Sequence, residues 1–262
     1  MADDSTKKTL IVALGVCLVC SVLVSTAAVG LKGIQKSNQK KDKLKNILMA
    51  GDLMQEGTDI EALFAKRIRA EVINLETGKP MNPADLDEEV KPEKFDVKEV
   101  SKSAKYTKPI PVDIDRADIK RKPKFMVVYK VMKGDSLIKW ILPLYGKGLW
   151  STMYGFIALD QDLRTIKGFT FYDQGETPGL GGEVDNPKWK ALWKNKLAFD
   201  TDGNVIIHVI KGKVDRNSPQ AKYEIDGLSG STLTTRGVDH LVRFWLGEHG
   251  YGPFFANLRG EG

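Results

Sequence analysis

The longest feature in the pattern of hydrophobic and polar positions is an uncharged apolar run near the N-terminus. From Thr9 to Leu31 the sequence reads TLIVALGVCLVCSVLVSTAAVGL. A helix rises about 1.5 Å per residue, so about 20 residues span the core of a bilayer. The run predicts a transmembrane helix over residues 9–31 after an N-terminal tail over residues 1–8. A cleaved signal peptide is the alternative, because STAAVG contains small residues that suit cleavage, although the usual apolar region has only about 7–15 residues.

The region that follows, residues 32–123, is predicted to be helical and irregular. Residues 35–54 are rich in lysine and carry Leu44, Ile47 and Leu48 at helical spacing, which indicates an amphipathic helix. Thr58 and Glu61 form the pattern T-x-x-E, which is typical of a capping box at a helix start. Residues 81–121 are polar and contain four prolines, so we expect an irregular excursion with room for one helix.

From residue 124 onward the pattern becomes that of a sheet. KFMVVYKVMK and LIKWILPLY flank the turn GDS, and STMYGFIALD and TIKGFTFYDQ flank QDLR, which predicts two hairpins. KWKALWKNK is typical of a short helix, NVIIHVIK of another strand, and a C-terminal helix is expected from about Gly237. One face of that helix is apolar, at Val238, Leu241, Val242, Trp245 and Leu246. The predicted class is α+β: a single domain over residues 124–262 with a mostly antiparallel sheet and flanking helices.

Composition narrows the possible functions. The 262 residues include 40 basic and 34 acidic ones, a net charge of +6, and the two signs are interleaved. Nucleic-acid binding needs a concentrated basic patch and is therefore disfavoured. Cys17 and Cys20 share one face of the apolar run and are interpreted as small packing residues of the helix. The sequence has no HExxH or paired CxxC motif, so no metal site is predicted. His208, within a predicted strand, is interpreted as structural.

Two glycine-rich loops carry the candidate chemistry. GETPGLGGEVDNP, residues 175–187, has four glycines and Pro178 within eight residues, a composition that permits close approach of the backbone to a ligand. It matches neither the Walker A nor the Rossmann pattern. An ordinary long turn is the alternative interpretation.

The second loop, DGLSGSTLTTRGV, lies before the predicted C-terminal helix. A helix N-terminus presents free N–H groups and a positive dipole, and so favours phosphate. The hydroxyls of Ser229, Thr232 and Thr234 would add donors, and Gly230 would let the backbone come near. A capped helix after a loop rich in serine and threonine is the alternative.

These residues also carry a family resemblance. LSGSTLTT resembles the signature S-G-[AS]-T-[LI]-T of domains that carry FMN through a phosphoester to threonine. ILPLYGKGLW, GETPGLGGEV, FWLG and the N-terminal KKTLIV resemble the C-subunit family of Na⁺-translocating NADH:quinone oxidoreductases. The G-subunit family of a related electron-transport complex shares the signature and is an alternative.

The resemblance implies a set of site residues. Thr232 would be the covalent FMN phosphoryl threonine, in a signature made of Ser229, Gly230, Ser231, Thr232, Leu233 and Thr234. The isoalloxazine ring would lie against Trp150, Glu176, Thr177, Leu180 and Gly181. Lys211 would lie near the flavin and favour its reduced anion. For Trp150 a core aromatic is the alternative.

The resemblance also implies a function: an electron-carrying subunit of a sodium-pumping translocase in the bacterial inner membrane. NADH oxidation and ubiquinone reduction would take place on other subunits, and a flavin transferase would attach the cofactor. A non-redox membrane-tethered module that binds a phosphorylated ligand and a free periplasmic flavoprotein remain alternatives.

The orientation of the chain is contested by its charges. Five lysines from Lys36 to Lys45 favour a cytoplasmic domain by the positive-inside rule. The resemblance implies a periplasmic domain, with the tail over residues 1–8 in the cytoplasm. The lysines are explained in that case by an amphipathic helix at the membrane surface, with Leu44, Ile47 and Leu48 facing the lipid.

Overall fold

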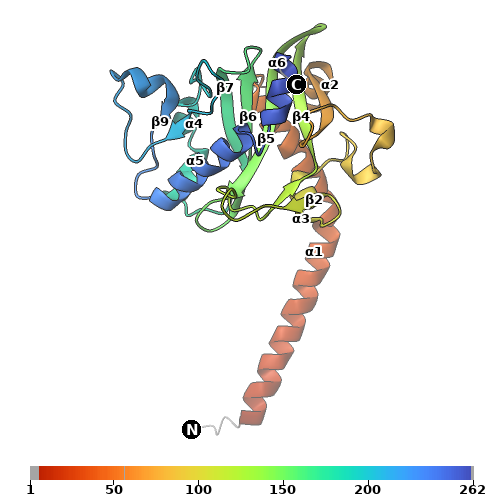
Figure 1. Cartoon of the computed structure of the whole chain (residues 1–262). Coiled ribbons are helices and arrows are strands. Elements are labelled where there is room, and N and C mark those ends of the chain that lie inside the picture. Colours follow the sequence, from red (N-terminus) through yellow and green to blue (C-terminus); the bar gives the residue numbers. More distant parts are fainter. Residues whose placement is uncertain (1–5, 56, 261–262) are drawn as a thin grey trace. The chain divides into compact units, whose positions relative to one another are not determined.

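The computed structural model describes residues 6–55 and 57–260, without the side chain of Lys36 (Figure 1). Most of the predicted tail, residues 1–5, lies outside the described residues. The chain divides into two units, 1–43 and 44–262, and the second is called the domain below.

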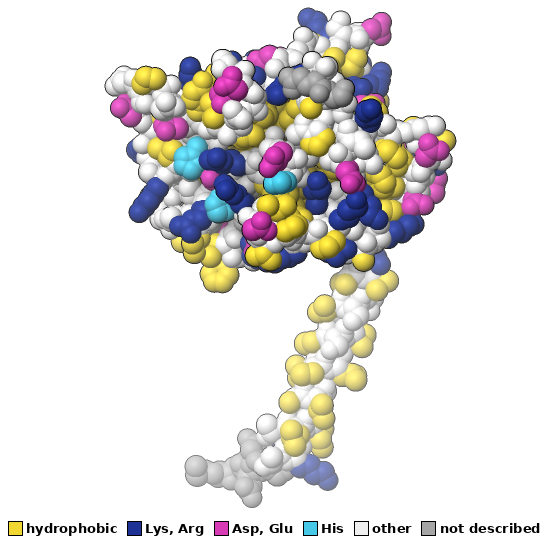
Figure 2. Space-filling model, in the orientation of Figure 1, with side chains coloured by type: hydrophobic (Ala, Val, Ile, Leu, Met, Phe, Trp, Pro, Cys, Tyr) yellow, Lys and Arg dark blue, Asp and Glu magenta, His cyan; other side chains and the backbone are white. Residues whose placement is uncertain are grey.

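Helix α1, Thr6–Ala50, contains the whole predicted membrane segment. Among the described residues it is the one helix long and apolar enough to cross a membrane by length and composition. The large apolar side chains from Leu10 to Ile34 are exposed, and Figure 2 shows apolar side chains on the surface of this helix. Residues 9–31 are helical, as predicted, and the helix continues without a break into the lysine-rich stretch. That this helix spans a membrane stays a prediction.

The last turns of α1 belong to the domain. Ile47 and Leu48 are fully buried in its core, and Ala50 packs so closely on Gly168 that a side chain there would collide with the Ala50 carbonyl. Since this apolar face contacts protein, the prediction that it faces the membrane surface is wrong.

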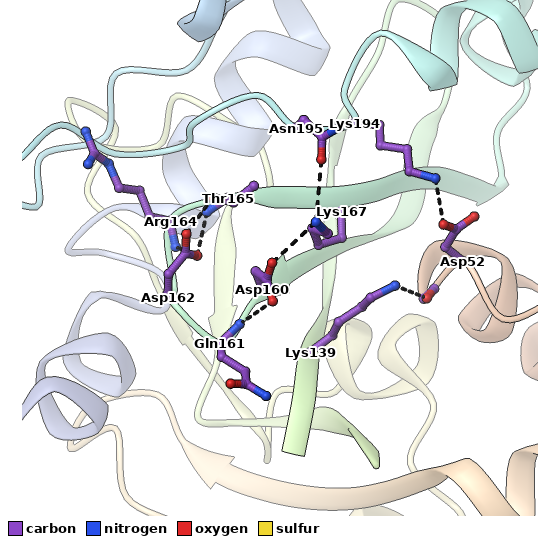
Figure 3. A network of polar contacts seen from close by, with 11 residues as sticks. Asp52, Lys139, Asp160, Gln161, Asp162, Arg164, Thr165, Lys167, Lys194 and Asn195 are labelled. Carbon is purple, nitrogen blue, oxygen red and sulfur yellow. Dashed lines mark hydrogen bonds and ion pairs between the residues drawn. The ribbon is translucent and has the colours of Figure 1, made fainter. Parts of the chain in front are cut away.

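Polar contacts hold the turn that follows α1, at Gly51 and Asp52, to the rest of the domain (Figure 3). The ammonium of Lys139 donates to the carbonyl of Gly51 at 2.7 Å, and Lys194 pairs with Asp52 at 2.6 Å. Nearby, Lys167 of β7 forms an ion pair with Asp160 of β6. The helix end is thus held by charged side chains as well as by burial.

Helix α2, Ile60–Arg67, begins one residue later than the capping box predicts. Asp59 is the N-cap, and its carboxylate accepts from the amides of Glu61 and Ala62. The hydroxyl of Thr58 donates instead to the carbonyl of Gln55. A carboxylate is favoured at this position because it is close to the positive end of the helix dipole.

The core of the domain is an antiparallel sheet. Within the described residues five strands are hydrogen-bonded in the order β1-β4-β5-β6-β7. Their bounds are β1 Ile68–Asn74, β4 Phe125–Lys133, β5 Ser136–Lys147, β6 Thr152–Asp160 and β7 Ile166–Asp173. Both predicted hairpins, β4–β5 and β6–β7, are confirmed. Because β1 pairs with β4, the predicted boundary between residues 123 and 124 falls inside this unit.

The excursion between β1 and β4 contains one α-helix within the described residues, α3 Val97–Lys102, as expected. It also contains two short 3₁₀ turns and a small antiparallel pair, with bounds η1 Pro83–Asp85, η2 Glu88–Val90, β2 Thr107–Pro109 and β3 Arg121–Pro123. Val90, Phe95, Val97 and Val100 are buried, so the excursion covers part of the core.

Short elements follow β7. They are η3 Gly181–Asp185, α4 Pro187–Ala191, β8 His208–Val209, η4 Pro219–Tyr223 and β9 Glu224–Ile225. The strand predicted over NVIIHVIK is reduced to the two residues of β8, which pair in parallel with β9. The prediction was too long because much of this apolar stretch bonds to irregular backbone, such as that of Ala198.

Helix α5, Thr232–Leu246, lies across the sheet (Figure 1). Its predicted apolar face is confirmed, since the five residues from Val238 to Leu246 on that face are at most 1% exposed. The indole N–H of Trp245 donates to the carbonyl of Tyr145 in β5. The helix begins five residues before the predicted Gly237, so the threonines of the signature lie in its first turn. Helix α6, Gly252–Arg259, was not predicted.

Candidate functional site

A cavity of about 390 Å³ lies where the glycine loop, the β5–β6 turn and the start of α5 meet. It is lined by Leu149, Trp150, Glu176, Thr177, Leu180, Gly181, Gly230, Ser231, Thr232, Leu233 and Thr234. Residues as far as 85 positions apart in the sequence, Leu149 and Thr234, therefore line the same site. Its volume is within the usual range for ligand pockets, about 300–1,000 Å³.

The carboxylate of Glu176 joins these segments. Its Oε1 accepts from the amides of Trp150 and Ser151 at 3.0 and 3.1 Å. Its Oε2 accepts from the amide of Leu149 at 3.1 Å and from the hydroxyl of Thr234 at 2.6 Å. One side chain thus ties the β5–β6 turn and the first turn of α5 to the glycine loop.

The protonation of Glu176 reflects these contacts. Burial, at 5% exposure, acts to raise the pKa of the carboxyl group. The hydrogen bonds from Thr234 and from the amides of Trp150, Ser151 and Leu149 outweigh burial and leave the pKa below its ordinary value. The group is therefore a carboxylate at neutral pH, with its charge satisfied by donors inside the protein.

Two glycines give the carboxylate its room. A Cβ at Gly148 would lie 2.5 Å from Glu176 Oε1, and a Cβ at Gly181 would lie 2.5 Å from the hydroxyl of Thr234 and 3.0 Å from Glu176 Oε2. Gly230, close to the signature threonine, has φ +71°, a left-handed conformation that favours glycine. Glycine is thus required here for close packing at two positions and for backbone conformation at a third.

The hydroxyl residues of the signature have two different roles. Ser231 donates to Thr234, which donates to Glu176, and Thr235 donates to the carbonyl of Ser231. Thr234, which was expected to donate to a phosphate, donates to the carboxylate of Glu176 in this structure. Ser229 and Thr232 are exposed, and their hydroxyls make no hydrogen bond with the described residues.

The N-terminus of α5 is open. Ser231 is at the N-cap position, but within the described chain no side chain caps the first turn, since the Ser231 hydroxyl is directed to Thr234. Ser231, Thr232, Leu233 and Thr234 line the cavity, so the uncapped positive end of the helix borders it. This arrangement favours an anion.

The cavity walls are apolar and exposed. Trp150 is 67% exposed, Leu233 52% and Leu180 45%, and Leu149 is also exposed. The alternative that Trp150 is a core aromatic is therefore wrong. Large apolar side chains gathered around one pocket are typical of a surface that a ligand or partner covers.

Ten of the twelve residues predicted for the site line this cavity, and Ser229 and Lys211 do not. Ser229 is exposed beside Gly230. Lys211 is exposed two residues after β8. Leu149 and Gly148 were missed as site residues, although the glycine just before the apolar pair Leu149-Trp150 was a signal of close backbone approach.

Other polar groups lie outside the site. His208 pairs through Nδ1 with Asp239 at 2.7 Å, consistent with its structural interpretation. No group of three or more His, Cys, Asp or Glu that could hold a metal occurs within residues 6–55 and 57–260.

Relatives of known sequence agree on one family. FMN-binding domains match residues 148–247. The C subunit of the Na(+)-translocating NADH-quinone reductase of Pseudomonas aeruginosa is 47% identical, over 98% of this chain and 97% of the relative. The same subunit of Vibrio alginolyticus is 43% identical, over 98% of this chain and 96% of the relative.

Solved structures agree as well. The crystal structure of NqrC from Shewanella oneidensis has a TM-score of 0.75 and 36% identity, and covers 85% of this chain and 99% of that one. The C subunit of the Na(+)-translocating NADH-quinone reductase from Parabacteroides distasonis has a TM-score of 0.64 and 28% identity, with 86% and 96% covered. The α+β fold is therefore shared with these proteins.

Proposed function

The chain belongs to the C-subunit family of the Na⁺-translocating NADH-quinone reductases, and on this basis we propose that it carries electrons within such a membrane complex, through an FMN linked by a phosphoester to Thr232. The observation that carries the proposal is a convergence in one cavity. An open helix N-terminus, an exposed threonine and exposed apolar walls meet there.

The phosphate end of FMN fits the start of α5. The free N–H groups of the first turn and the positive dipole favour a phosphate, and Gly230 lets the backbone approach it. Thr232 is exposed at this point, so its hydroxyl is accessible to phosphorus.

The ring end of FMN fits the apolar walls. Trp150 and Leu180 would each cover part of a flat aromatic ring, and their exposure in the protein alone would be reduced by it. Glu176 supports the wall through the amides beside Trp150, and its carboxylate contacts the protein instead of the ring.

Attachment needs an activated donor, because a threonine hydroxyl is a poor nucleophile on its own. In the proposed step the bond from Thr232 Oγ1 to phosphorus forms and a phosphoanhydride bond of a flavin nucleotide breaks. The other half of the donor leaves as a nucleoside monophosphate, and the threonine proton passes to a base. A flavin transferase would supply the base and bind the donor.

Redox chemistry would be supplied by the flavin when bound, and the chain would hold it and set its electrostatic surroundings. Partner subunits would oxidise NADH, reduce ubiquinone and conduct sodium. The Pseudomonas and Vibrio relatives are both C subunits and match over nearly their full length, which favours this family over the G-subunit family.

The test is intact mass and in-gel fluorescence of denatured protein made with a flavin transferase. We expect one FMN phosphoryl group on the wild type and none on Thr232→Ala. Thr235→Ser keeps the internal hydroxyl and is the control that should remain labelled. A colourless wild type would favour the non-redox tether, and flavin on Thr232→Ala would refute the residue assignment.

Orientation is part of the proposal. We propose that α1 anchors the chain in the inner membrane with the domain in the periplasm. Because Ile47 and Leu48 are buried in the domain, a helix at the membrane surface no longer explains the five lysines from Lys36 to Lys45. These lysines oppose the proposed orientation, and the family membership supports it. A phosphatase fused after Gly262 should be active, and a fusion active only as a cytoplasmic reporter would overturn the orientation. Dependence of the mature protein on detergent would separate an anchor from a cleaved signal peptide.

A further inference from the structure

The proposed function leaves one feature of the site unexplained. A buried carboxylate, Glu176, lies at the edge of a cavity that should receive an anionic phosphate. Like charges repel, so the carboxylate has to provide something that outweighs this cost. Its four donors show what that is.

We infer that Glu176 is a positioning residue that makes Thr232 the one flavin-accepting threonine of the signature and keeps the phosphate at the start of α5. The inference rests on the proposed function. Glu176 was expected to contact the isoalloxazine ring, and the inference gives it a different role, the selection of the attachment site.

The first step concerns the three threonines. Thr234 is 0% exposed and donates to Glu176, and Thr235 is buried between the carbonyl of Ser231 and the amide of Leu228. A hydroxyl that donates to a carboxylate is chemically an activated nucleophile. Thr234 is nevertheless protected, because its side chain is buried and a Cβ at Gly181 would lie only 2.5 Å from its hydroxyl oxygen. Thr232 alone among the three is exposed.

The second step concerns the β5–β6 turn. The amides of Leu149, Trp150 and Ser151 all point at one place, which is the geometry of an anion-binding turn. The carboxylate of Glu176 occupies that place. Without it, three free amides and the hydroxyl of Thr234 would form a second phosphate site within the same cavity, and this site would compete with the N-terminus of α5.

The third step concerns Trp150. Its own amide and both neighbouring amides are held by Glu176, so the carboxylate fixes the backbone of the wall while the indole remains exposed. The distance from this wall to Thr232 is thus set through Glu176 and Thr234. A single side chain therefore aligns the ring end and the phosphate end of the site.

The test measures flavin attachment in folded full-length variants treated with a flavin transferase for a fixed time. Glu176→Gln keeps the size of the side chain but replaces one acceptor oxygen by an NH₂ group, which cannot accept from the donors of the site. Thr234→Val removes one of these donors. In both variants we expect the rate of attachment at Thr232 to fall about tenfold or more, which corresponds to about 1.4 kcal/mol in activation free energy. Thr234→Ser keeps the hydroxyl and should stay within about twofold of the wild type, and Glu248→Gln, at an exposed position, is the matched control.

A second readout separates positioning from stability. Stacking on Trp150 should quench the fluorescence of the flavin. We therefore expect the fluorescence to be higher than in the wild type in Glu176→Gln and Thr234→Val, and to be at the wild-type level in Thr234→Ser. The double variant should be no slower than Glu176→Gln, because the two side chains act through one contact. Wild-type rates and fluorescence in both single variants, or a lower Tm as the only change, would overturn the inference. If Glu176→Gln does not fold, the Thr234→Val and Thr234→Ser pair decides alone. An unlabelled wild type would refute the proposed function itself.

Discussion

Two cavities border opposite ends of helix α5, and they differ in what their polar groups do. The cavity of about 390 Å³ lies at the N-terminus of the helix, and a groove of about 220 Å³ lies near its C-terminus. The groove is lined by Glu76, Lys108, Pro109, Ile110, Pro111, Ile114, Lys122, Pro123, Lys124, Phe244 and His249. In the groove Lys108 pairs with Glu76 at 2.6 Å, and Lys124 donates to the carbonyl of Lys105.

The comparison shows that hollow space alone does not make a site. Lysines suit the negative end of a helix dipole, and those of the groove largely find partners in the protein. At the other end the helix has no cap among the described residues, and one threonine of the first turn stays exposed. Of these two cavities, the N-terminal one combines uncapped N–H donors, an available nucleophile and apolar walls, and the groove does not.

The largest expected effect is on stability at the groove. Phe244 is buried, and Phe244→Ala should lower the free energy of unfolding by about 3–5 kcal/mol, because a cavity replaces the ring. Covalent flavin per folded chain should not change, because the two cavities share only the helix. Urea unfolding and intact mass check both points. Loss of flavin in the folded fraction would mean that the groove and the site are coupled.

The next effect is at the glycine loop. In Gly181→Ala the new Cβ would lie 2.5 Å from the hydroxyl of Thr234 and 3.0 Å from the Cβ of Glu176. Overpacking of this kind costs about 1–3 kcal/mol, and we expect an altered flavin absorbance as well. In the matched Gly175→Ala the Cβ would lie 3.3 Å from Ser151, so both changes should be smaller. Equal effects of the two substitutions, measured by thermal unfolding and absorbance, would remove the special role of Gly181.

The pH dependence should distinguish the N-terminal cavity through Glu176. Because its folded pKa is lowered, the unfolded state binds the proton more readily, and the stability it contributes is present above the unfolded value of about 4.3. That stability is lost as pH falls through the folded pKa. Urea unfolding at several pH values should show a smaller loss in acid for Glu176→Gln than for the wild type, and an intermediate one for Thr234→Val. Identical acid profiles would contradict the role of these hydrogen bonds.

The smallest effect on stability is expected at the exposed wall. Trp150→Ala should change the free energy of unfolding by no more than about 0.5 kcal/mol, because the side chain is 67% exposed. Flavin fluorescence should nevertheless increase, since a stacking partner is lost. Lys122→Gln in the groove should leave the fluorescence unchanged. A large loss of stability in Trp150→Ala would show that the indole packs as core.

Much of the fold was predictable because its signals are local. The apolar run, the two hairpins and the apolar face of α5 depend on spacing within a few residues, and each is confirmed. The errors occur where local signals compete. Asp59 caps α2 in place of Thr58, the start of α5 lies among residues that are usually helix flanks, and the last turns of α1 were assigned to the membrane surface.

By itself the sequence determined which segments could form a site: a glycine loop, an apolar turn and a hydroxyl-rich helix start. Only the tertiary structure decided what each hydroxyl does. The contact between Glu176 and Thr234 joins residues 58 positions apart, so no local pattern contains it. The same holds for the burial of Ile47 and Leu48, whose apolar face fits a membrane surface or a protein core equally well. Periodicity records which side chains share a face, and folding alone brings a partner to that face.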